Sequence, residues 1–213
     1  MSNGMEALYP FLYEEPSGFD AVMEHVRRST VEKAAEIVAV RRTVGERFGE
    51  QLEACAREMG ARFSAGGRLF TFGNGGSSTD AAAVAGAFLA GGAGGRPLPA
   101  LTLTADVAVL TALGNDVGFD VVFARQLAAM GRPGDIALAT STSGGSENVL
   151  RALDEAKRRG ILTVGLAGYD GGRMAEAGLD YLFAVPSSSV HRIQEAQTTL
   201  YHVLWTLVQD SLT

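Results

Sequence analysis

Two segments of the chain combine the residue types that bind phosphate. The first runs from Arg68 to Asp80 (RLFTFGNGGSSTD) and the second from Asp135 to Ser146 (DIALATSTSGGS). Each joins a short apolar run to a loop of Gly, Ser, Thr or Asn, and a helical pattern follows. Glycines let backbone N–H groups converge on an anion, hydroxyls add donors, and the N-terminus of the next helix carries positive partial charge. Two such loops in one chain predict a phosphorylated ligand.

Strand-like and helical patterns alternate around these loops. Apolar runs typical of strands lie at 69–72, 100–104, 136–140, 163–167 and 181–185. Parallel strands need long crossover connections, so the alternation predicts an α/β fold in which helices cover both faces of a five-stranded parallel sheet. Apolar periodicity predicts two amphipathic N-terminal helices, from Phe19 to Arg42 and from Val44 to Phe63. A wide apolar stripe from Ser189 to Leu212 predicts a long C-terminal helix that packs against the core and another subunit.

The composition limits the class of protein. Of the 213 residues 46% are hydrophobic, which suits one domain with a full core. The formal charge of −6 argues against a nucleic-acid partner, which needs clustered Lys and Arg. Cys55 is the sole cysteine, and neither a leader peptide nor a membrane-length apolar run is seen. We expect a cytoplasmic protein without a membrane partner, with an irregular arm at 1–18 and a single domain at 19–213.

Two nucleotide-binding motifs resemble the first loop in composition but differ from it in detail. A dinucleotide fingerprint would have its third glycine at Ser78, and no acidic residue ends a second strand about twenty residues later. A Walker loop needs a Gly-Lys-Ser/Thr step, which the chain lacks. Dinucleotide binding and nucleotide hydrolysis are therefore disfavoured. The remaining alternative for either loop is a turn whose glycines serve only the backbone.

Short motifs follow one another from about residue 45 to the C-terminus. They are FGNGGS at 72–77, Asp80, LGND at 113–116, STSGGS at 141–146, Asn148, GYDGG at 168–172 with Met174 and Ala175, and RIQE at 192–195. Their succession resembles the phosphoheptose isomerase group of sugar isomerase (SIS) domains. The resemblance implies a three-layer α/β/α sandwich and a homotetramer with sites shared between subunits. The group contains sedoheptulose 7-phosphate isomerases and non-catalytic relatives such as the DnaA-initiator-associating protein.

The resemblance implies that the ligand is a sugar phosphate, with a heptose phosphate expected, and that its phosphate binds at the two loops. It assigns phosphate binding to Asn74, Ser77, Ser141, Thr142, Ser143 and Ser146. The residues lead to the same place independently, because these hydroxyls and the N-terminus of the helix near Glu147 can converge on one anion without a cation. The alternative is that the hydroxyls only cap that helix. By resemblance Asp116 faces the sugar hydroxyls, although it could equally belong to a turn.

The chemistry implied by the resemblance interconverts a ketose and an aldose through an enediolate. It needs a base that takes a proton from the carbon next to the carbonyl, and a group or metal that stabilises the enediolate. In phosphoheptose isomerases, a histidine and a glutamate after the first loop, with a glutamine and a histidine on the C-terminal helix, can bind zinc. The glutamate and the later histidine form the acid/base pair. By resemblance His202 is an acid/base residue supported by Gln194 and Glu195, and His202 and Gln194 are ligands if zinc binds.

The helix after the first loop departs from this pattern. Ala83 stands at the family's histidine position and Ala87 at its glutamate position, and no ionisable side chain follows Asp80 on this helix. Zinc normally needs three or four protein ligands, so Gln194 and His202 alone make an incomplete site. The sequence itself requires no cofactor.

Other groups could supply the missing base. They are Asp80, Asp116, Glu195 or a residue of a neighbouring subunit, and His191 could also reach the site. The alternative for His202, on an apolar stripe, is a core or interface histidine. Three hypotheses follow: an isomerase of a sugar phosphate, a non-catalytic sugar-phosphate-binding protein that acts through a protein partner, and a structural tetramer. The retained phosphate loops argue against the third, and the missing glutamate argues against the first.

Overall fold

The computed structural model describes residues 19–92 and 94–212. The irregular arm expected at 1–18 lies outside the described residues. The chain divides into two compact units, residues 1–39 and 40–213. None of the helices within the described ranges has the length and apolarity needed to cross a bilayer.

Helix α2 runs from Phe19 to Ser64 without a break. The prediction of two helices separated near Thr43 was wrong, because no residue in this stretch ends a helix. Gly45 destabilises a helix interior by only about 1 kcal/mol relative to alanine, and the segment contains no proline. Within the second unit, α2 buries Phe48 and Met59 in the core.

A five-stranded parallel sheet forms the centre of the second unit, which confirms the predicted fold class. Its strands are β1 (Leu69–Gly73), β2 (Ala100–Thr102), β3 (Ile136–Ser141), β4 (Leu162–Gly168) and β5 (Tyr181–Val185). They lie in the order β2-β1-β3-β4-β5, and every neighbouring pair is parallel. β2 ends two residues earlier than its apolar run, because the chain turns after Thr102.

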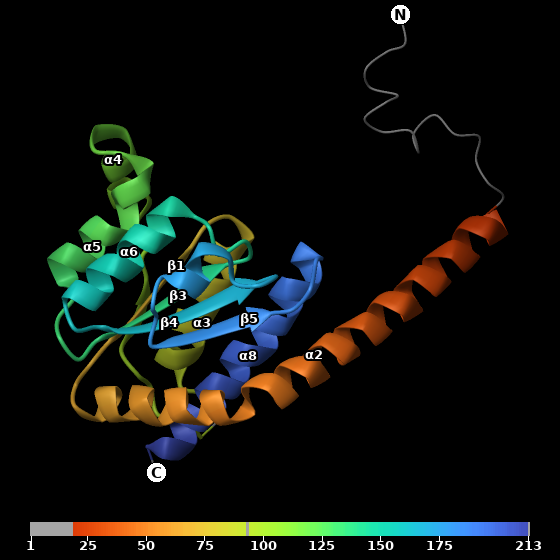
Figure 1. The fold of residues 1–213 in the computed structure, drawn as a ribbon, viewed down its shortest axis with the longest axis horizontal. Helices are drawn as coiled ribbons and strands as arrows, with labels where there is room; N and C mark the ends of the chain where they lie inside the picture. Colours follow the sequence, from red (N-terminus) through yellow and green to blue (C-terminus); the bar gives the residue numbers. More distant parts are fainter. Residues whose placement is uncertain (1–18, 93, 213) are drawn as a thin grey trace, which may run out of the picture. The chain divides into compact units, whose positions relative to one another are not determined.

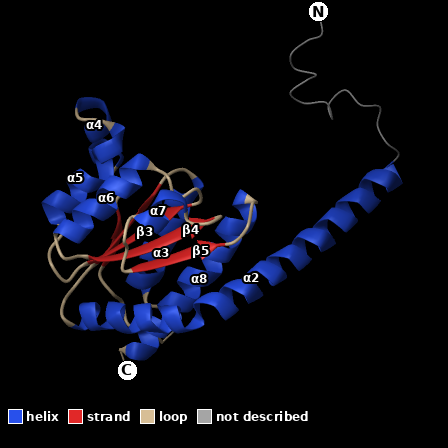
Figure 2. Cartoon of the chain, viewed as in Figure 1, coloured by secondary structure: helices blue, strands red, loops and turns tan. Residues whose placement is uncertain are grey.

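Helices cover both faces of this sheet (Figure 1 and Figure 2). They are α3 (Gly76–Ala90), α4 (Val107–Asp116), the 3-10 turn η2 (Phe119–Val121), α5 (Val122–Met130), α6 (Glu147–Arg158), α7 (Gly172–Glu176) and α8 (Val190–Ser211). One core joins the sheet to α3, α8 and the part of α2 in the second unit; the other joins it to α5, α6 and α7. Along β1, Leu69 faces the first core and Phe70 the second, as alternation in a strand requires.

The order of the strands brings the two predicted loops together. From β1 the chain crosses through α3 to β2 on one side, and β3 then pairs with the other side of β1. The direction of winding therefore switches between β1 and β3. In open parallel sheets, ligands bind beyond the carboxyl ends of the strands at such a switch point. The loops that follow Gly73 and Ser141 lie at this position.

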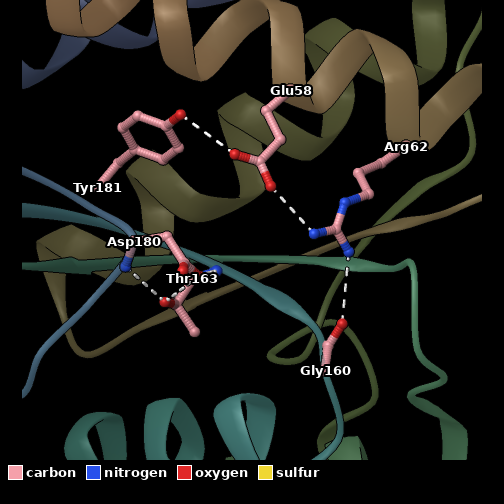
Figure 3. Close-up of polar contacts among 6 residues, drawn as sticks. All are labelled: Glu58, Arg62, Gly160, Thr163, Asp180 and Tyr181. Carbon is pink, nitrogen blue, oxygen red and sulfur yellow. Dashed lines mark hydrogen bonds and ion pairs between the residues drawn. The ribbon is translucent and has the colours of Figure 1, made fainter.

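The opposite end of the sheet is held by polar contacts to α2 (Figure 3). Glu58 accepts hydrogen bonds from the Tyr181 hydroxyl at 3.1 Å and from Arg62 at 3.0 Å. Asp180, just before β5, accepts bonds from the backbone and the hydroxyl of Thr163 on β4, both at 2.8 Å. The bonds between Asp180 and Thr163 fix the register of β4 and β5 at the N-terminal end of these strands.

Candidate phosphate and sugar site

The loop after β3 closes on itself and gathers its hydroxyls. The Oγ atoms of Ser141 and Ser146 are 3.3 Å apart, and the Gly144 N–H donates to the Ser141 carbonyl at 3.1 Å. Ser143 is exposed, and its Oγ accepts a hydrogen bond from the Gly145 N–H at 3.2 Å. Three of the predicted phosphate residues therefore lie in one tight turn. Thr142, the fourth in this loop, is half-buried, and its carbonyl accepts a bond from Gly168.

The hydroxyl of Ser146 does not cap the helix that follows. Ser146 is the N-cap residue of α6, but its side chain makes no capping hydrogen bond. The first N–H groups of a helix have no partner within the helix, and they carry its positive partial charge. The alternative in which these hydroxyls serve only as caps therefore has no support at Ser146. An anion at this position would meet both hydroxyls and helix N–H groups.

This loop is locked against the segment after β4 by glycines. Gly144 has a φ of +61°, and a Cβ there would lie 1.9 Å from the Gly171 carbonyl oxygen. Gly172 has a φ of +51°, and a Cβ there would lie 2.3 Å from the Ser143 carbonyl oxygen. Backbone packs directly on backbone, so only glycine fits at either position. The GYDGG motif therefore packs against the loop after β3 and fixes its backbone.

The loop after β1 is joined to the loop after β3 by an amide pair. The Nδ2 of Asn74 donates to Oδ1 of Asn148 at 2.8 Å, and the Nδ2 of Asn148 donates back at 2.9 Å. Asn148 is buried in the first turn of α6. Asn148 is part of the sequence motifs, but no role was predicted for it. The residue pattern contains no signal that Asn148 pairs with Asn74. Asn74, predicted to contact phosphate, uses part of its amide to hold the two loops together.

The second residue predicted from this loop, Ser77, is buried in the first turn of α3. Its carbonyl accepts a bond at 2.7 Å from the hydroxyl of Thr140, which lies on β3. A Cβ at Gly73 would lie 2.4 Å from the same hydroxyl, so the end of β1 must be glycine. Asn74 and Ser77 are therefore fixed next to the β3 loop.

Gln194 on α8 reaches the start of α3. A Cβ added to Gly76 would lie 2.4 Å from the Gln194 Nε2, so the amide lies directly against the first turn of α3. One turn further along α8, Gln197 is wholly buried and neither of its amide atoms has a hydrogen-bond partner. Of these two amides of the C-terminal helix, the sequence motif contained only Gln194, whose amide lies against α3.

One face of α3 carries the positions at which the resemblance expects chemistry. Spacings of four, three and four residues place Gly76, Asp80, Ala83 and Ala87 in one row along the helix. Ala83 is exposed and Ala87 half-buried, and each presents a methyl group. Asp80 is the only ionisable side chain of α3.

Three predicted residues have other surroundings. His202 is exposed on α8, with its ring 4.8 Å from that of Tyr201, so within the described chain it is no core histidine. Glu195 forms an ion pair with Arg192 on its own helix. Asp116 is exposed as the last residue of α4, and it accepts a bond from Asn115 at 2.8 Å. Among the described residues, no hydrogen bond or ion pair joins any of these three to the loops after β1 and β3.

His191 and Glu147 complete the residues considered from the sequence. His191 is exposed in the first turn of α8. Glu147, the first residue of α6, pairs with Arg173 at 2.8 Å and with Arg151 at 3.1 Å. Hydrogen bonds from Arg173 and then Arg151 lower the pKa of the Glu147 carboxyl. The two guanidinium groups offset its charge near the phosphate loop.

The donor set does not fit the zinc site implied by the resemblance. Among residues 19–92 and 94–212, no three His, Cys, Asp or Glu side chains are placed to hold one metal ion. The two positions on α3 that would complete the implied ligand set with Gln194 and His202 are Ala83 and Ala87, whose methyl groups cannot coordinate a metal.

Sequence and structure comparisons define the class of protein. A model of the SIS domain matches residues 28–168. The phosphoheptose isomerase of Rhodospirillum rubrum is 43% identical over 173 residues, which cover 78% of this chain and 90% of that protein. The phosphoheptose isomerase of Aneurinibacillus thermoaerophilus is 40% identical over 194 residues, which cover 91% and 94%.

Solved structures agree with these matches. The phosphoheptose isomerase of Neisseria gonorrhoeae superimposes with a TM-score of 0.81 at 34% identity, covering 87% of this chain and 99% of that one. That of Francisella tularensis gives a TM-score of 0.73 at 31% identity, covering 92% and 100%. Fold and loops are those of a SIS domain. The chain belongs to the phosphoheptose isomerase group of the SIS-domain family.

Proposed function

We propose that the protein binds a phosphorylated sugar, a heptose phosphate, with its phosphate at the loops after β1 and β3. The observation that carries this proposal is the β3 loop. Its Ser141 and Ser146 hydroxyls converge beside the N-terminus of α6, and the side chain of Ser146 is not used as a cap. Helix N-termini with clustered N–H and hydroxyl donors bind phosphate without a cation. The names of the relatives support a heptose phosphate.

For the reaction, we propose aldose–ketose isomerisation of this sugar phosphate, as the relatives' names indicate. The chain's residues would act in turn. The loops bind the phosphate, Gln194 positions the sugar beside α3, and Asp116 hydrogen-bonds the sugar hydroxyls. His202, supported by Glu195, moves a proton between the sugar oxygens. We propose no metal in these steps, and metal analysis of the purified protein by plasma mass spectrometry tests this: about one zinc per chain would contradict it.

A second candidate function is favoured by α3. Ala83 and Ala87 stand where the resemblance expects a histidine and a glutamate on this helix, whereas both predicted phosphate loops are present. Such a protein would bind sugar phosphate without turnover and would alter its contact with an unidentified protein partner.

Nuclear magnetic resonance with sedoheptulose 7-phosphate separates the two functions. An isomerase produces new aldose phosphate signals over time, and these signals are lost in His202→Ala. A non-catalytic binder broadens the sugar phosphate lines without producing new signals. If neither turnover nor broadening occurs, the assignment of this sugar phosphate is wrong.

Replacing Ser141 and Ser143 by alanine is expected to abolish thermal stabilisation by sugar phosphate while leaving the fold intact. In the wild-type protein, ligand at a hundred times its Kd stabilises by about 2.7 kcal/mol, because it binds only the folded state. Scanning calorimetry with and without sedoheptulose 7-phosphate measures the difference. Ser64→Ala, exposed at the end of α2, is the control and should keep the full shift. Unchanged stabilisation of the double variant would place the phosphate elsewhere.

We also propose that the protein is a cytoplasmic homotetramer. Residues 19–39 of α2 expose Val22, Met23, Val26, Val31 and Val38, at 44 to 62% of their surface. Val22 and Val26 lie one turn apart, and Val31 and Val38 lie two turns apart on another side of the helix, so this part of α2 exposes apolar side chains that another subunit would cover. Light scattering should give four times the 22.3 kDa of one chain, and Val31→Asp should lower the mass. A wild-type mass of 22.3 kDa would contradict the tetramer, and recovery in a membrane fraction would contradict the localisation.

A further inference from the structure

We propose that Asp80 is the proton-transfer residue of α3, taking the place of the glutamate that Ala87 has replaced. The inference rests on the proposed isomerase function. The isomerase reaction needs a base, and neither Ala83 nor Ala87 can accept a proton. Any base on this helix must therefore be Asp80, the one ionisable side chain of α3.

The position of Asp80 fits this role. It lies one turn after Gly76, in the row that continues to Ala83 and Ala87. Gly76 is also the residue against which the Gln194 amide packs. Asp80 therefore lies between the loop after β1 and the two alanines. It is on the face of α3 against which the Gln194 amide packs. Its Cα is about 6 Å along the helix from that of Gly76, at a rise of about 1.5 Å per residue.

The carboxyl group is not engaged in the fold. Its Oδ2 is buried and has no hydrogen-bond partner. Oδ1 forms no bond either and reaches the surface. Burial raises the pKa of this carboxyl, as expected for a group that has lost water on one side without gaining a donor. Elsewhere in the fold, buried carboxylates accept hydrogen bonds: Asp135 from Arg68, for example. A carboxylate held without donors is more basic and is available to accept a proton.

The substitutions at Ala83 and Ala87 leave this row open. Methyl groups replace the longer histidine and glutamate side chains of the family pattern, so nothing on α3 stands between Asp80 and a sugar lying along the row. A sugar anchored by its phosphate at the loop could bring its carbonyl end along this face.

The proton transfer balances without a metal or cofactor. The Asp80 carboxylate takes the proton from C1 of the ketose. The C–H bond breaks, its electron pair forms the C1–C2 double bond, and the charge moves to the oxygen on C2. The carboxylic acid then gives the proton to C2 while the hydroxyl proton on O1 passes to O2, which yields the aldose. Oxidation at C1 equals reduction at C2.

The test follows solvent deuterium into the sugar. The protein is incubated in D₂O with sedoheptulose 7-phosphate, and NMR records deuterium at the exchanging carbons. Asp80→Asn keeps the shape of the side chain but cannot accept a proton, so the exchange rate is expected to fall at least about a hundredfold. Thermal stabilisation by the sugar phosphate should persist. Asp154→Asn, an exposed aspartate of α6, should exchange at the wild-type rate.

Rescue separates proton transfer from a structural role. Adding Ala87→Glu to Asp80→Asn restores a carboxylate to the same helix face, and we expect the exchange to return. A structural defect at position 80 would not be repaired two turns away. If asparagine prevents folding, Asp80→Glu takes its place. Moving the carboxylate by one methylene should slow exchange at least about tenfold.

The outcomes distinguish this proposal from the proposed function. If Asp80→Asn exchanges within about threefold of wild type, or if Ala87→Glu leaves its loss unrepaired, the role of Asp80 is refuted and the isomerase stands. Unchanged exchange in Asp80→Glu, where that variant is used, refutes it too. If the wild-type protein exchanges nothing while sugar phosphate still stabilises it, both the isomerase and the role of Asp80 are refuted, and the non-catalytic function remains.

Discussion

Gly144→Ala is expected to abolish sugar phosphate binding and to lower the free energy of unfolding by about 2–4 kcal/mol. The new Cβ would meet the Gly171 carbonyl oxygen at 1.9 Å, and alanine disfavours the φ of +61° at this position. The backbone of residue 144 fixes the position of the Cβ, and the atom that it meets is a backbone oxygen, so neither can rotate away. The β3 loop must shift, and the shift separates the Ser141 and Ser146 hydroxyls from the α6 N-terminus.

The neighbouring glycine is a matched control. At Gly145 a Cβ would have its nearest neighbour, the Ser143 Oγ, at 3.8 Å, which is ordinary contact. Gly145→Ala should therefore keep both stability and ligand response. Urea unfolding gives the free energies, and calorimetry with sedoheptulose 7-phosphate gives the binding. If Gly144→Ala bound the ligand like Gly145→Ala, the loop geometry would not be the source of phosphate affinity.

Asp135→Ala is expected to cost about 2–3 kcal/mol of stability without changing the ligand-binding loops. Asp135 is buried just before β3, at the end of the strands opposite to the ligand. Its carboxylate accepts bonds from the Arg68 backbone N–H at 2.9 Å, from the Arg68 guanidinium at 2.8 Å and from the Arg132 N–H at 2.9 Å. Removal leaves the two backbone N–H groups without this acceptor, and the guanidinium keeps only its bond to the Met130 carbonyl at 2.7 Å. The exposed Asp154→Ala serves as the control in urea unfolding.

The stability that Asp135→Ala removes should decrease at low pH. Burial alone would raise the pKa of the Asp135 carboxyl, but the hydrogen bonds from Arg68 and Arg132 outweigh burial and lower it. The folded state thus holds the proton less tightly than the unfolded state. The stabilisation is complete above the ordinary aspartate pKa of about 3.9 and is lost as the pH falls through the lower folded pKa. The difference between wild type and Asp135→Ala should shrink below about pH 4; a difference that grows there would contradict this account.

The sheet and the position of the loop after β3 could be predicted because their signals are local. Apolar runs located all five strands, and the hydroxyl and glycine residues at 141–146 located the loop. Helix α2 was misread because a change in pattern near Thr43 is not a helix stop.

Other parts of the site depend on contacts between distant residues. Asn74 and Asn148 are 74 positions apart and meet only because β1 and β3 are neighbours. The buried Oδ2 of Asp80 likewise results from the packing around α3, which no local pattern reports. Whether Thr142, Asp116 and His202 serve the ligand stays a prediction: Thr142 belongs to the β3 loop, whereas Asp116 and His202 lie on α4 and α8.

The switch between β1 and β3 also has a consequence for the order of folding. β3 pairs with β4 and β4 pairs with β5, which are neighbours along the chain, so these pairings close shorter loops. The β1–β3 pairing must enclose α3, β2, α4 and α5, and closing a longer loop costs more entropy. The two loops of the proposed phosphate site follow the two strands of this late pairing. We expect ligand binding to appear only in the final phase of refolding, so a sugar phosphate would stabilise the native protein without accelerating its early steps.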